Sequence, residues 1–185
     1  MPTKRDFTAT TLVVHNGRVL LHPHRKLGLV LPLGGHVEAD ELPDDAALRE
    51  VFEESGLEVE LVHSEPVWPL SDVRQLARPV AVLLEDIEPG HQHIDLIYVA
   101  TLREPGREDG HPAGNGSEQL LWLAADELDR VEMPANVRAL ARYALELVEN
   151  EGRNGGAKRA DRAVRRRGAG ERNDMLPRPD GPQLA

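Results

Sequence analysis

Residues 49–57 read Arg-Glu-Val-Phe-Glu-Glu-Ser-Gly-Leu (REVFEESGL), and they carry three glutamates at helical spacing. Glu50, Glu53 and Glu54 are three and four positions apart, which places their carboxylates on one face of a helix, where like charges repel one another. A hard divalent cation makes such a cluster favourable, because it binds oxygen ligands and neutralises the repulsion. The spacing alone leaves a second interpretation open, a solvated acidic helix face.

The residues around this stretch predict a helix over 43–55. Pro43 suits the first helical turn, and Asp44 and Asp45 complement the helix dipole there. Gly56 suits the position that ends a helix. The glutamates then lie opposite an apolar stripe that is expected to face inward and consists of Ala47, Leu48, Val51 and Phe52.

Most other segments of the first 150 residues are predicted to be strands. Asn16-Gly17 is a two-residue hairpin signal between the first two of them. A second amphipathic helix is expected over 136–149. The predicted strands cover residues 7–15, 18–24, 28–33, 58–63, 79–87, 94–102 and 119–123.

Length and composition limit the class of protein. A chain of 185 residues with 40% hydrophobic and 29% charged residues is typical of one globular domain. It has no cysteine, which excludes disulfides, thiolate metal sites and cysteine nucleophiles. No export signal is visible, and no apolar stretch approaches the roughly 18 residues that a membrane helix needs. We therefore expect a cytoplasmic protein with no membrane partner.

The distribution of charge predicts a boundary near residue 150. Residues 1–150 hold 13 Lys and Arg against 27 Asp and Glu, whereas residues 151–185 hold 9 against 5. The second segment is rich in Gly, Arg and Pro and poor in large apolar side chains, so we predict a basic, disordered tail after a domain of residues 1–150. The acidic domain makes nucleic acid an unlikely partner, because phosphate contacts dominate that affinity.

A longer pattern surrounds the glutamates. Gly35 is followed by five residues and Glu41, then by seven residues and the stretch from Arg49 to Leu57. This resembles the signature of the Nudix hydrolases, G-x5-E-x7-R-E-U-x-E-E-x-G-U, where U is aliphatic. The resemblance implies an α/β fold, the Nudix-type α/β/α sandwich with a mixed β-sheet between helices.

The resemblance also implies roles for the residues of the pattern. Glu50, Glu53 and Glu54 correspond to metal ligands, while Arg49 and Glu41 correspond to orienting partners. The residues support these roles independently, because Arg49 lies four positions before Glu53 and can pair with it. Mg²⁺ is the expected cofactor, with Mn²⁺ as a substitute.

The implied reaction is hydrolysis of the pyrophosphate bond in a nucleoside diphosphate linked to another moiety. Metal-assisted attack by water suits this anionic bond. Glu53 is the first candidate for the general base and Glu118 the second, with Glu50 and Arg49 completing the catalytic set. Glu118 reads equally well as an exposed residue at the entrance of a strand.

Further residues are candidates for binding a small nucleotide-type substrate. Gly34 and Gly35 permit a tight turn over the site. Arg25 precedes this turn in the sequence and could bind a terminal phosphate; the alternative is that it is a solvated basic residue. His91, His93 and Asp95 alternate, so a strand places them on one face. His93 and Asp95 are predicted to contact substrate; the alternatives are a transition-metal site through the two imidazoles and a polar cluster without chemistry.

Three classes of function compete at this point. We favour the magnesium-dependent pyrophosphohydrolase. A Nudix-fold isomerase of isoprenoid diphosphates is disfavoured, because its best-known relatives rely on a cysteine that this chain lacks. The third class is a Nudix-fold nucleotide-binding or regulatory module without turnover, which usually loses carboxylates that are all present here.

Overall fold

The computed structural model describes residues 3–24, 28–63, 67–68, 72–103 and 120–168, with side chains as far as residue 153. These residues form strands, one short 3-10 helix and two α-helices. In chain order the elements are β1 (Lys4–His15), β2 (Arg18–His24), β3 (Leu29–Leu31), β4 (Leu33–His36), α1 (Pro43–Ser55), β5 (Val59–Leu61), β6 (Ala81–Glu88), β7 (His91–Leu102), β8 (Leu121–Ala124), η1 (Leu128–Arg130) and α2 (Ala135–Gly168).

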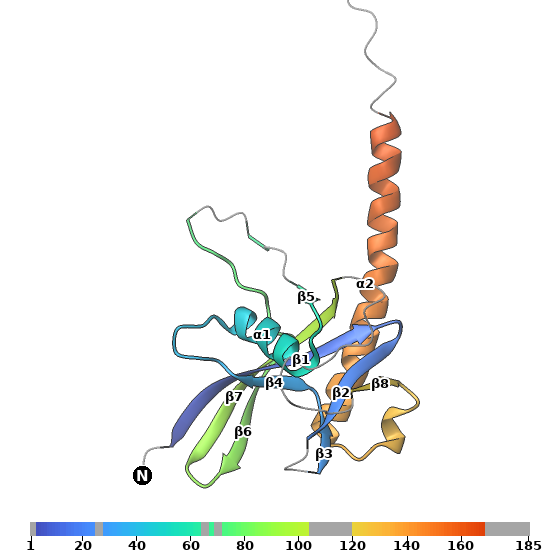
Figure 1. Ribbon diagram of the computed structural model, residues 1–185. Coiled ribbons are helices and arrows are strands. Elements are labelled where there is room, and N and C mark those ends of the chain that lie inside the picture. The colour runs from blue at the N-terminus through green and yellow to red at the C-terminus, as the bar shows by residue number, and fades with distance from the viewer. Residues whose placement is uncertain (1–2, 25–27, 64–66, 69–71, 104–119, 169–185) are drawn as a thin grey trace, which may run out of the picture. The chain divides into compact units, whose positions relative to one another are not determined.

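The described strands form one mixed sheet with β1 at its centre (Figure 1). β1 pairs in parallel with β7 along nearly its whole length, from Lys4 opposite His91 to Val14 opposite Thr101. Its other edge pairs antiparallel with β4 and then with β2. β7 in turn pairs antiparallel with β5 and β6. The parallel pair joins two segments that lie far apart in the sequence.

The alternation of side chains along β1 supplies two hydrophobic cores, one on each face of the sheet. Val13 packs with Val51 of α1 in the first core. Leu12, its neighbour, packs with Ala141 of α2 in the second core. The two helices therefore cover opposite faces of the sheet. The predicted α/β/α sandwich with a mixed sheet is confirmed.

Helix α1 begins and ends as its sequence predicts. Pro43 occupies the first turn, and Gly56 ends the helix in the left-handed conformation with φ of 70°. The Gly56 N–H donates a hydrogen bond of 2.7 Å to the Phe52 carbonyl. Ser55 adds a second constraint, because its buried hydroxyl donates to the Val51 carbonyl and accepts from the Leu57 N–H.

One residue of the predicted apolar stripe does not face inward. Phe52 is 46% exposed, whereas Ala46, Ala47 and Val51 are fully buried. Successive residues of a helix are rotated by about 100°, so Phe52 turns away from the face that Val51 buries. The apolar stripe that faces the core therefore includes Ala46 and excludes Phe52.

The strand predicted over residues 28–33 is divided in two. β3 pairs with β2, while β4 pairs with β1, and Pro32 separates them. Proline has no N–H to donate, so the ladder is interrupted there. As a result Gly34 and Gly35 lie on β4, hydrogen-bonded to the central strand rather than in a loop.

The final helix is longer than the predicted 136–149, because α2 continues to Gly168. Arg, Lys and Ala are strong helix formers and no proline interrupts residues 135–168, which explains a helix where the sequence predicts disorder. The chain separates into two compact units, Met1–Glu149 and Asn150–Ala185. In the described part of the chain no helix is both long and apolar enough to cross a membrane.

A pair of identical substitutions tests the assignment of buried and exposed positions on two neighbouring strands. Val99 on β7 is 1% exposed and Val82 on β6 is 58% exposed. We expect Val99→Ala to lower the free energy of unfolding by about 2 kcal/mol, from two lost methyl groups and the cavity they leave. Val82→Ala should change it by less than about 0.5 kcal/mol. Urea denaturation measures both values, and equal effects would contradict the assignment of the core.

Candidate active site

Glu50 and Glu54 of α1 lie against the glycine pair of β4, and β1 holds the two elements together. β4 pairs with β1 from Leu33 to His36, and α1 packs on the same part of the sheet through Ala47 and Val51. Glu50, Glu53 and Glu54 are therefore carried on a helix that is fixed against the strand bearing Gly34 and Gly35. Rigid elements of this kind place functional groups more accurately than loops do.

Arg49 is the centre of the charged cluster. Its guanidinium donates from Nε and Nη2 to both oxygens of Glu41, at 2.8 and 2.9 Å. Nη1 donates to Glu50 at 2.7 Å and to Glu53 at 3.2 Å, and Nη2 also donates to the His36 carbonyl at 3.1 Å. These bonds raise the pKa of Arg49, with Glu41 the largest cause, and Arg49 lowers the pKa of the Glu41 carboxyl.

Glu50 and Glu54 approach the backbone of β4. The Gly34 N–H donates a hydrogen bond of 3.0 Å to Glu54 Oε2. The Glu50 carboxylate lies where a side chain on Gly35 would begin, since a Cβ there would be 2.6 Å from Glu50 Cδ and 2.7 Å from Oε2. Gly35 is thus required because Glu50 occupies its side-chain space, not because of an unusual backbone conformation.

The cluster retains negative charge after its internal pairing. Arg49 is one cation in contact with Glu41, Glu50 and Glu53, and Glu54 lies beside them on the same helix. Glu53 is the most open of these carboxylates, with 56% of its side chain exposed against 15% for Glu50. An all-oxygen, net negative cluster with an open member has the donor chemistry that Mg²⁺ prefers.

A cavity of about 370 Å³ lies beside this cluster, and Glu54 and Gly34 belong to its wall. The rest of the wall is formed by residues of β1, β2, β3, β6 and β7 and by the start of α2. Most of these residues are apolar. A cavity of this size, lined by apolar and polar side chains, is typical of small-molecule sites. The polar side chains that line it include Thr10, His22, Glu85, Asp95 and Asn136.

Asp95 is the most buried carboxylate in the cavity wall, at 5% exposure. Its two oxygens accept hydrogen bonds from Thr8 Oγ1 at 2.9 Å and from Thr10 Oγ1 at 2.8 Å. Burial raises the pKa of Asp95, while the bonds from Thr10 and Thr8 oppose this shift. Burial also raises the pKa of Glu85, and the charge of Asp95 adds to that effect. The cavity wall thus carries two carboxyls, one buried (Asp95) and one partly buried (Glu85).

The three alternating residues of β7 lie in two different surroundings. Asp95 lines the cavity, whereas His93 and His91 lie nearer the start of the strand, beside Asp6 of β1. Burial lowers the pKa of His93, and the neighbouring His36 and His91 lower it further, while the charges of Asp6 and Asp95 oppose the shift. The substrate contact predicted for Asp95 fits its position, and that predicted for His93 stays a prediction.

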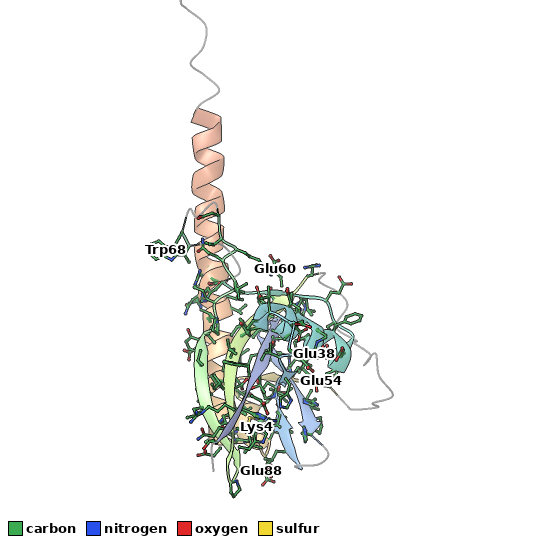
Figure 2. All side chains as sticks on the ribbon, turned by 90° about the vertical axis from the view of Figure 1, so that its left-hand side faces the viewer. Lys4, Glu38, Glu54, Glu60, Trp68 and Glu88 are labelled. Carbon is green, nitrogen blue, oxygen red and sulfur yellow. The ribbon has the colours of Figure 1, made fainter. Side chains whose placement is uncertain are left out.

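Two predicted site residues, Arg25 and Glu118, lie outside the described residues. Three residues that sequence reasoning missed, Thr8, Thr10 and Glu85, reach the site by strand pairing. Thr8 lies opposite Asp95 in the parallel β1–β7 pair, a register that the sequence does not encode locally. Trp68, an exposed aromatic residue, lies well away from Glu54 in Figure 2.

Comparison with known proteins gives the family. A model of the NUDIX domain matches residues 5–147. A curated relative named "Probable DHNTP pyrophosphohydrolase", from Lactococcus lactis subsp. cremoris (strain MG1363), is 35% identical over 105 residues. This match covers 56% of the chain and 58% of the relative, so the chain spans less than two thirds of that protein.

Solved structures agree with the family model. The crystal structure of a NUDIX family hydrolase from Clostridium perfringens has a TM-score of 0.70 and 35% identity, and covers 78% of this chain and 99% of that one. A MutT NUDIX hydrolase from Burkholderia pseudomallei shares the fold at a TM-score of 0.53 and 21% identity, covering 77% and 97%. The resemblance of residues 35–57 to the Nudix signature is confirmed, and the chain belongs to the NUDIX family.

Proposed function

We propose that the protein is a magnesium-dependent pyrophosphohydrolase that cleaves the diphosphate bridge of a nucleotide or nucleotide-like substrate. The observation that carries this proposal is the position of Glu54, which belongs both to the acidic cluster of α1 and to the wall of the cavity. A ligand that fills the cavity therefore has its polar end beside the carboxylates. The NUDIX family and the names of the relatives support the same reaction class.

The metal would be held by Glu50, Glu53 and Glu54. Bound there, Mg²⁺ or Mn²⁺ supplies charge screening for the diphosphate and lowers the pKa of water. Glu53 is the proposed general base, because its carboxylate is the most exposed of the cluster and is open to an attacking water. Arg49 is a positioning residue: it fixes the rotamers of Glu50 and Glu53 while Glu41 anchors its other edge.

The wall of the cavity would recognise the substrate. Asp95 and Glu85 accept hydrogen bonds from donor groups of a heterocyclic base, and the apolar wall excludes water from the opposite face. Gly34 and Gly35 bring backbone close to the diphosphate. The name of the Lactococcus relative makes DHNTP the first substrate to test. A cytoplasmic location and a functional domain of residues 1–150 belong to this proposal.

A substrate panel with and without Mg²⁺ tests the function. The panel contains DHNTP, nucleoside triphosphates, nucleoside diphosphate sugars, ADP-ribose and dinucleoside polyphosphates. Products are separated into phosphate, pyrophosphate and nucleoside monophosphate, which locates the bond that breaks. Magnesium-dependent cleavage of a diphosphate bridge is expected. Tight binding of a panel member without cleavage would favour a binding module instead.

Substitution of the proposed base should abolish turnover without unfolding the domain. We expect Glu53→Gln to lower kcat by about 100-fold or more, with an unchanged melting temperature because the side chain is largely exposed. Glu60→Gln, an exposed glutamate on β5, is the matched control and should keep the parental rate. Parental turnover in Glu53→Gln would exclude this residue from catalysis.

The adjacent glycines should respond differently to the same substitution. A methyl group on Gly35 meets only the carboxylate end of Glu50, which can move. Gly35→Ala should therefore cost about 10-fold or more in turnover with little loss of stability. A methyl group on Gly34 meets backbone, at 2.5 Å from the Ala9 carbonyl and 2.8 Å from Thr10 Cα. Gly34→Ala should lower the free energy of unfolding by about 1–3 kcal/mol.

Circular-dichroism melts and steady-state kinetics on both glycine variants separate these effects. A Gly35→Ala protein that melts early but retains its turnover per folded molecule would contradict the assigned role of Glu50.

Removal of residues 151–185 tests the proposed domain. The family model ends at residue 147, and the site lies within Met1–Glu149. We expect kcat and KM of the shortened chain to stay within about 2-fold of the full chain, equivalent to less than about 0.5 kcal/mol. A large loss of turnover in a protein that still melts cooperatively would place a functional element after residue 150.

A further inference from the structure

Three side chains of metal-binding type meet where β1 and β7 begin. The parallel register places Asp6 of β1 opposite His93 of β7, and Lys4 opposite His91. One ligand atom from each of Asp6, His91 and His93 lies within 4.8 Å of the others. Two strands that are far apart in the sequence thus bring two imidazoles and one carboxylate to a single point.

The geometry is already close to that of a first coordination shell. His91 Nε2 and Asp6 Oδ2 are 2.8 Å apart. Donors at about 2.0–2.1 Å from a tetrahedral ion are about 3.4 Å from one another, so only a small outward movement is needed to admit a cation. We propose that Asp6, His91 and His93 form a second cation site, which binds a transition metal of the Zn²⁺ class with its fourth position open.

An unsatisfied nitrogen supports this site. His93 Nε2 is buried and, among the described residues, has no hydrogen-bond partner. Its ring lies between two others, with centroid distances of 5.0 Å to His91 and 4.9 Å to His36. A buried polar atom without a partner costs free energy, and a bound metal would remove that cost. The rings on either side hold the imidazole in place.

The present partners of the cluster do not block it. Lys4 Nζ lies 2.7 Å from Asp6 Oδ2, but the Lys4 side chain is 70% exposed and can move into solvent when a divalent cation replaces its charge. Glu88, with Oε1 3.8 Å from His91 Nδ1, adds negative charge at the outer side. Lys4 and Glu88 lie below Glu54 in the view of Figure 2.

Ligand chemistry separates the two sites. Imidazole nitrogens favour Zn²⁺, Co²⁺, Ni²⁺ and Cu²⁺, whereas Mg²⁺ favours carboxylates and water. The glutamate cluster of α1 has oxygen donors only. An excess of Mg²⁺ should therefore saturate the glutamate cluster and leave the Asp6, His91 and His93 site available to a transition metal. This inference does not depend on the proposed hydrolysis.

Titration with Co²⁺ in a large excess of Mg²⁺ tests the site on the full chain. Nitrogen-ligated Co²⁺ of low coordination number absorbs visible light much more strongly than the hydrated ion, so absorbance reports binding directly. Competition by Zn²⁺ then gives its affinity. We expect one equivalent of Co²⁺ to bind and Zn²⁺ to displace it.

Five variants decide between the possible locations. His91→Gln and His93→Gln should each weaken Co²⁺ binding by about 10-fold or more, as loss of one metal ligand does, and Asp6→Asn should weaken it less. His15→Gln, which removes a histidine at the other end of β1, is the control and should bind as the parent does. Glu53→Gln should also bind as the parent does, because it alters only the α1 cluster.

Each result has a defined meaning. Unchanged Co²⁺ absorbance in both His91→Gln and His93→Gln, with parental circular dichroism, would overturn the proposal. Loss of the absorbance in Glu53→Gln would also overturn it, by placing the ion at the α1 cluster. A failure here leaves the proposed hydrolase function untouched, since that function is measured with Mg²⁺ and substrate.

Discussion

The alternation of side chains along β1 is the constraint on which the rest of the domain depends. Odd-numbered residues such as Ala9 and Val13 pack toward α1, and even-numbered residues such as Leu12 pack toward α2. The same alternation points Thr8 and Thr10 at Asp95. One strand therefore divides the domain into a face that carries α1 and a face that carries the cavity. A slip of one residue in its register would exchange the two.

The glutamate cluster shows how a protein keeps like charges together before any ligand arrives. Arg49 is bound from one side by Glu41, which leaves its other edge to hold Glu50 and Glu53. The backbone N–H of Gly34 holds Glu54. The hydrogen bonds from Arg49 and Gly34 thus orient the carboxylates, and Arg49 neutralises part of their charge. Enough negative charge remains to attract a cation. Preorganisation of this kind lowers the cost of assembling the site in each catalytic cycle.

Much of this arrangement could be predicted from the sequence, because its signals are local. The helix over 43–55 depends on Pro43, Gly56 and the spacing of apolar residues, all within one segment, and the signature around Arg49 identified the family.

The contacts of Asp95 with Thr8, and of His93 with Asp6, could not be predicted, because they depend on the register of a parallel pair joining distant segments. Phe52 was misplaced because the rotation of about 100° between successive helical residues turns it away from the core that Val51 faces. The extension of α2 was missed because composition distinguishes poorly between a solvated helix and a disordered chain.

The choice of donor atoms has a consequence for the environments in which the protein can work. Both proposed groups of cation ligands offer only oxygen and nitrogen, and the chain contains no thiol. Peroxide and disulfide reagents inactivate many metalloproteins by consuming a cysteine ligand. Such reagents find no ligand to oxidise here, so cation binding should respond to acidity and to the supply of metal rather than to redox stress.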